Sequence, residues 1–109
     1  MAIIEFQVQG SAATPYTVTF VQDAGRLSAH CTCPAGTTGQ YCKHRLSILA
    51  GSGAAIVSPN SADISVVTGW LAGSPLEQAL KDLATAEGDF ERAQKALAAS
   101  KKKVAAAMR

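Results

Sequence analysis

Large core-forming side chains are scarce in this chain of 109 residues. The chain has three Phe, two Tyr and one Trp, although 48% of its residues are hydrophobic. Twenty-one of the residues are Ala, which adds little burial energy per residue. A core of this composition would struggle to hold a small domain together by apolar burial alone. We therefore expect a stabilising cross-link or a partner chain.

Other absences narrow the class of protein. No run of 18 apolar residues occurs, so the sequence predicts no membrane-spanning helix and no membrane partner. The first ten residues have no basic segment followed by an apolar stretch, so no signal peptide is expected. The count of three Cys is odd, which argues against a closed disulfide framework and indicates a reducing, cytoplasmic compartment. A net charge of +2 is too small for the whole molecule to attract polyanions strongly.

Three regions differ in composition and predict an α+β protein. Alternating apolar residues predict strands near residues 4–8, 16–20 and 26–31, and the spacing in residues 42–50 predicts a helix. Asp23-Ala24-Gly25 is typical of a hairpin turn. The expected fold is thus a β-hairpin or three-stranded sheet plus a helix, in ββα order, followed by a long C-terminal coiled-coil helix. The expected domains are residues 1–50, a linker over 51–74 with a short helix near Ser61, and residues 75–109.

Four residues with metal-ligating side chains lie close together in the sequence: Cys31, Cys33, Cys42 and His44. Zinc prefers four nitrogen or sulfur ligands in a tetrahedron, and three Cys with one His are an ordinary structural set. Cys31 and Cys33 end a strand, where residues two apart share a face. Alternatives are a group of buried free thiols, a redox role for the Cys-x-Cys pair, or iron in place of zinc. We predict Zn²⁺ as the cofactor.

This pattern resembles the SWIM zinc finger, a family with a CxC…CxH signature on a β-hairpin followed by a helix. Cys31-Thr32-Cys33-Pro34 and Cys42-Lys43-His44 are similar to the CxCP and CKH segments of that family, and the resemblance covers roughly residues 14–50. It implies that the two segments supply the four zinc ligands. SWIM domains are associated with DNA binding and protein–protein contact, often within larger chromatin, transposase or helicase proteins.

Cations near the motif are candidates for nucleic-acid contact. Arg26, Lys43 and Arg45 would either offset the formal charge of −1 on a zinc centre with three thiolates or bind phosphate. His30 adjoins the motif, but strand parity places it on the opposite face, so we expect it at the surface. In the C-terminal region, Lys101, Lys102 and Lys103 are either a solvated helix end or a second nucleic-acid contact.

The C-terminal region predicts a coiled-coil helix with one large and one small residue per heptad. It begins at a capping box, Ser74-Pro75-Leu76-Glu77. Residues 75–91 carry a net charge of −4 and residues 92–109 carry +6, which favours an antiparallel homodimer. Gly88 leaves an intramolecular helical hairpin as the alternative. The predicted dimer seam consists of Leu76, Ala79, Leu83, Ala86, Phe90, Ala93, Leu97 and Val104.

Together these features predict a non-enzymatic zinc-binding interaction module. We expect a small dimeric regulator or adaptor that contacts nucleic acid or a protein. The alternative is a structural or assembly protein, of bacterial or phage type, in which zinc only stabilises the fold. An enzyme is not expected, because a closed four-ligand site leaves no open position for water.

Overall fold

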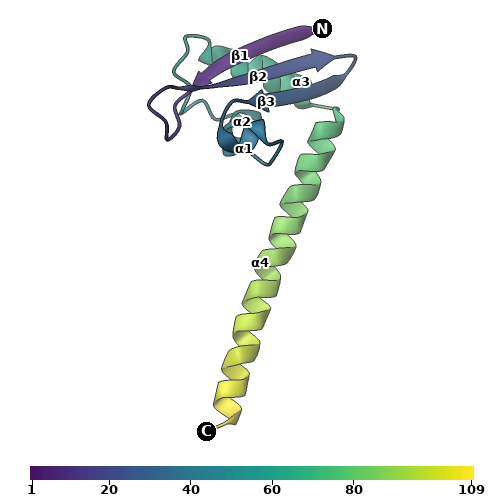
Figure 1. The fold of residues 1–109 in the computed structure, drawn as a ribbon. Helices are drawn as coiled ribbons and strands as arrows, with labels where there is room; N and C mark the ends of the chain where they lie inside the picture. The colour runs from purple at the N-terminus through teal and green to yellow at the C-terminus, as the bar shows by residue number, and fades with distance from the viewer. The chain divides into compact units, whose positions relative to one another are not determined.

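The computed structural model describes all 109 residues, which form two compact units, Met1–Glu77 and Gln78–Arg109. We call the first unit the head and the second the tail. The head contains a three-stranded sheet and several short helices, and the long helix α4 (Pro75–Ala107) begins at its end (Figure 1). The α+β class and the long C-terminal helix are confirmed.

The sheet is antiparallel and has the strand order β1-β2-β3. Its strands are β1 (Ala2–Val8), β2 (Tyr16–Asp23) and β3 (Arg26–Cys31), in the three regions where alternation predicts them. One face carries the core, in which Phe6 and Phe20 meet edge to face with ring centroids 6.0 Å apart. The buried residues on this face are Phe6, Val8, Val18, Phe20, Leu27 and Cys31.

The hairpin between β2 and β3 turns through two residues. Asp23 pairs with Arg26, so the loop consists of Ala24 and Gly25, and both have positive φ angles, 52° and 78°. Positive φ at both central residues is the mark of a type I′ turn, whose twist matches that of the flanking strands. The predicted hairpin is therefore present, with Ala24 in a backbone conformation that favours Gly or Asn.

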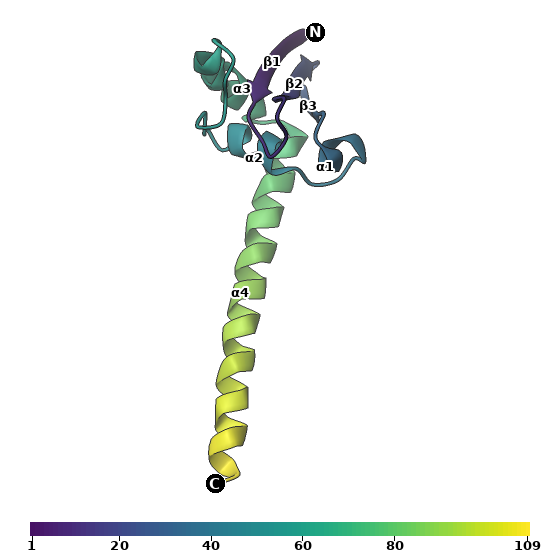
Figure 2. The same cartoon turned by 60° about the vertical axis from the view of Figure 1, so that its left-hand side comes forward.

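Two helices cover the buried face of the sheet, as Figure 2 shows from the side. These are α2 (Lys43–Leu49) and α3 (Ile64–Leu71). Ile48 and Leu49 of α2 and Val67 of α3 close the core. A further helical turn, α1 (Pro34–Thr37), lies in the segment between the second and third Cys.

Residues 51–74, expected to be a linker, are part of the head. The amide of Gln9 donates to Ala55 O and the amide of Val57 donates to Gln7 O, so this segment pairs with the outer edge of β1. The Asn60 side chain adds a hydrogen bond of 2.7 Å to Glu5 O. A 3-10 turn over Ser61–Asp63 leads into α3, which is the short helix expected near Ser61.

Helix α4 is continuous over 33 residues. It begins at the capping serine, because the Ser74 hydroxyl accepts a hydrogen bond of 3.4 Å from the Glu77 amide. It passes through Gly88 without interruption, so the alternative of a helical hairpin is wrong. None of its residues is buried, and the side chains of Phe90, Leu97 and Val104 are 64%, 56% and 58% exposed. No helix of the protein is long and apolar enough to cross a bilayer.

Candidate metal centre

Four short pieces of backbone bring the three Cys and the His together. Cys31 is the last residue of β3, and Cys33 caps the N-terminus of α1. Cys42 immediately precedes α2, and His44 is in the first turn of that helix. The chain therefore leaves the sheet, makes one helical turn and returns, which brings Cys42 and His44 close to the first two Cys.

The four ligand atoms lie within 4.8 Å of one another. The sulfurs of Cys33 and Cys42 are 3.4 Å apart, and His44 Nδ1 is 3.6 Å from Cys42 Sγ and 3.8 Å from Cys31 Sγ. All three Cys are buried and none forms a disulfide. The four residues predicted as ligands thus form one cluster at the edge of the core.

These distances fit a tetrahedral zinc ion. Zinc bonds of about 2.3 Å to sulfur and about 2.0 Å to nitrogen place two sulfurs about 3.8 Å apart, and a sulfur and a nitrogen about 3.5 Å apart. The observed separations are close to both values. Soft thiolate ligands with one imidazole are the donor set that zinc prefers. The geometry therefore suits a closed site with four protein ligands.

Backbone amides support the sulfurs. The Gly36 amide donates to Cys33 Sγ at 3.3 Å, and the Cys33 amide donates to Cys31 Sγ at 3.5 Å. At Gly36 the backbone passes very close to β3, since a Cβ there would lie 2.3 Å from Cys31 O and 2.8 Å from Cys31 Cβ. Only glycine fits this approach without a shift of the ligand-bearing backbone. Spacing alone did not identify Gly36, because the close approach exists only in three dimensions.

The thiols differ in their readiness to ionise. Burial raises the pKa of the Cys31 thiol to about 12. For Cys42 burial acts in the same direction, but the Arg45 backbone amide and hydrogen bonds within the cluster outweigh it and lower the pKa to about 6. One sulfur of the cluster is thus poised as a thiolate, and a bound cation would deprotonate the others outright.

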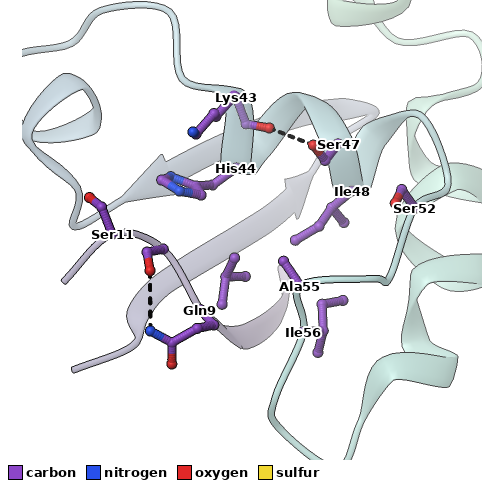
Figure 3. A pocket seen from close by; sticks show the side chains of 11 residues that line it. Gln9, Ser11, Lys43, His44, Ser47, Ile48, Ser52, Ala55 and Ile56 are labelled. Atoms are coloured by element: carbon purple, nitrogen blue, oxygen red, sulfur yellow. Dashed lines mark hydrogen bonds between the residues drawn. The ribbon is translucent and has the colours of Figure 1, made fainter. Parts of the chain in front are cut away.

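The His44 ring is held from its other side. It lies against the Tyr16 ring, with centroids 5.1 Å apart. A Cβ at Gly10 would lie 2.4 Å from the Tyr16 ring and 3.1 Å from His44 Nε2, so the small residue leaves room for both rings. Figure 3 shows the imidazole projecting from α2 toward the loop at Ser11, on one side of a pocket of about 460 Å³. This arrangement directs Nδ1 toward the sulfurs.

The remaining sequence candidates take different positions. His30 is exposed and is not part of the cluster, as strand parity predicts. Lys43 is exposed beside the cluster, whereas Arg26 lies at the opposite end of β3 from Cys31. The Arg45 guanidinium donates to the backbone carbonyls of Ala29 and Gln40. Arg45 therefore ties α2 to the edge of β3 and to the loop before Cys42, a role that its charge alone did not reveal.

The head thus contains a compact finger in which a β-hairpin and a helix present three Cys and one His to a common point. The SWIM zinc finger family model matches residues 16–50, a range that includes all four clustered residues. This match covers about a third of the chain, and it confirms the resemblance of the two Cys-containing segments to that family. No curated protein and no solved structure matches the chain.

Proposed function

We propose that this protein is a non-catalytic zinc-binding module that acts as a small dimeric adaptor. The observation that carries this proposal is the Cys3His cluster within a SWIM finger. The zinc ligands are Cys31, Cys33, Cys42 and His44. Bound zinc would compensate for the scarcity of large core side chains in the head, because its bonds would join the end of β3 to the start of α2.

The donor set supports a structural role for the metal. A catalytic zinc needs an open coordination position and a nearby general base. Here the protein offers four ligand atoms to one point, and the cluster contains no carboxylate. The finger therefore serves as a rigid platform that displays the surface of the sheet and of α2.

The exposed apolar stripe of α4 supports dimerisation. A helix of 33 residues is about 50 Å long, and such a helix alone would leave Phe90, Leu97 and Val104 in water. A second copy in antiparallel orientation would set the acidic half, residues 75–91, beside the basic half, residues 92–109. In parallel orientation like charges would meet, so we favour the antiparallel homodimer.

The partner of the dimer is a protein or a nucleic acid, and the positions of the cationic side chains in the head favour a protein. Of its three candidate phosphate contacts, Arg45 is occupied by backbone carbonyls and Arg26 lies at the far end of β3. The lysines at positions 101–103 are the densest cationic stretch of the chain. If these lysines bind nucleic acid, the logarithm of affinity will fall steeply with the logarithm of salt concentration.

Two measurements test this proposal. Light scattering of the zinc-loaded protein at tens of micromolar is expected to give twice the chain mass of 11.2 kDa. A monomeric mass would contradict the proposed dimer but not the proposed zinc-binding module. Titration with duplex DNA and RNA at low and moderate salt then decides the partner class. No binding at low salt favours a protein partner or a structural assembly role in which zinc only stabilises the fold.

A further inference from the structure

The structure assigns a register to the antiparallel pair, an inference that rests on the proposed dimer. We use the coiled-coil letters a to g, with the large seam residues at a and the small ones at d. Position a then holds Leu76, Leu83, Phe90, Leu97 and Val104, and position d holds Ala79, Ala86, Ala93, Ser100 and Ala107. In antiparallel coiled coils each layer combines an a residue of one helix with a d residue of the other.

Leu76 belongs to the head. It lines an apolar groove with Leu27, Leu46 and Leu49, and it lies in the same compact unit as these residues. The seam available to a partner helix therefore begins at Leu83. We infer that the two helices align so that the residue numbers of facing seam positions add up to 190.

Every layer of this register joins one large and one small side chain. A small residue opposite each large one lets the two backbones approach closely and bury the exposed stripe. The layers between one copy and the other are Leu83 with Ala107, Phe90 with Ser100, Leu97 with Ala93, and Val104 with Ala86. All three strongly exposed apolar residues of the tail seam, Phe90, Leu97 and Val104, are thereby covered.

The charges that flank the seam agree with the same register. In antiparallel pairs e faces e and g faces g. Glu87 then faces Lys101 of the second copy at e, and Asp89 faces Lys103 at g. Each contact occurs twice by symmetry, and Asp89 also pairs with Arg92 within its own helix. Leu80 faces Met108, which is 77% exposed in the single chain, so that apolar residues meet at the ends.

Neighbouring registers are poorer. A shift that returns Leu76 to the seam, facing Ala107, sets Glu87 opposite Gln94 and Lys101 opposite Leu80, and keeps a single flanking ion pair, Asp82 with Lys103 at g. A parallel pair would bring Asp82 at g against Glu87 at e, which is a like-charge contact. The register with sums of 190 is therefore favoured because it has two flanking ion pairs where the shifted register has one, and because it leaves Leu76 in the groove of the head.

Charge reversal tests this register, with dimer dissociation constants measured by sedimentation at low salt. Glu87→Lys and Lys101→Glu are each expected to weaken the dimer about five- to ten-fold, and the double variant is expected to restore it. Lys102→Glu is the matched control, because position f points away from the seam, and it is expected to leave the dimer unchanged. All three positions are exposed, so circular dichroism should show the wild-type helix content in every variant.

Each outcome bears on one part of the account. A monomeric wild-type protein overturns the dimer of the proposed function. A wild-type dimer that the single reversals weaken but the double variant does not restore overturns the register alone. A tighter dimer in Glu87→Lys overturns the antiparallel orientation, because that change would relieve the parallel contact with Asp82.

Discussion

Replacement of Gly36 by Ala tests how closely the backbone is fitted around the metal. The new Cβ would lie 2.3 Å from Cys31 O, 2.8 Å from Cys31 Cβ and 2.9 Å from Cys31 C. Ordinary contacts of this kind are about 3.5 Å or longer, so roughly 1 Å of movement is needed. The atoms that must move belong to the backbone that carries the first two sulfurs.

The expected loss follows from that overlap. Overpacking of this severity costs about 1–3 kcal/mol, and 1.4 kcal/mol corresponds to a factor of ten. The apparent zinc affinity of Gly36→Ala should therefore fall about five- to a hundred-fold. Competition with a chromophoric chelator at constant pH measures this affinity directly, and the amide that donates to Cys33 Sγ is retained in the variant.

Gly69→Ala is the matched control for this variant. Gly69 lies within α3, and a Cβ there would meet no heavy atom within 4 Å. Because Ala is a better helix former than Gly, this change should stabilise the head by about 1 kcal/mol and leave zinc affinity at the wild-type value or slightly above. Wild-type zinc affinity in Gly36→Ala, or an equal fall in both variants, would show that close packing of Gly36 against Cys31 does not support the metal site.

Three further predictions concern the head and the tail separately. Removal of zinc by a strong chelator, or the substitution Cys33→Ser, should abolish the sheet signal in circular dichroism and leave α4 helical, and an unchanged sheet signal would contradict a stapling role. Gly88→Ala should raise the free energy of unfolding of the tail by about 1 kcal/mol in thermal denaturation, because the residue lies within one continuous helix on the face away from the seam. A loss of helix content in this variant would contradict a continuous helix. Ala24→Asn should stabilise the zinc-loaded head by about 1 kcal/mol in chemical denaturation, since φ at this position is 52°, and no gain would argue against the type I′ turn.

Features with a local or periodic signature could be predicted from the sequence. Apolar residues alternate in the strands, the turn contains Gly25, and the four ligands have a CxC…CxH spacing that is typical of a metal site. The start of α4 follows from the capping chemistry of Ser74, and its heptads continue in phase through Gly88, so the continuous helix follows from periodicity.

Features that depend on contacts between distant parts of the chain were not predictable. Residues 51–74 have a weak pattern because their order comes from pairing with β1, as in the bridge between Val8 and Ile56. Charge suggested phosphate contact for Arg45, whereas the structure directs its guanidinium to two carbonyl groups. Likewise Leu76 has the heptad spacing of a seam residue but lines a groove of the head. In each case a tertiary contact decides between two roles that the sequence allows equally.

Metal titration followed by absorption shows whether the three Cys and His44 bind one metal ion in a tetrahedral site. Cobalt(II) is a visible reporter for tetrahedral zinc sites, and thiolate ligands add strong charge-transfer bands in the near ultraviolet. We expect saturation at one equivalent of cobalt per chain, with an intense tetrahedral spectrum that is lost when zinc displaces cobalt and that is weaker in Cys42→Ser. A weak spectrum typical of six-coordinate cobalt, or a spectrum unchanged by Cys42→Ser, would contradict a zinc site made by these three Cys and His44.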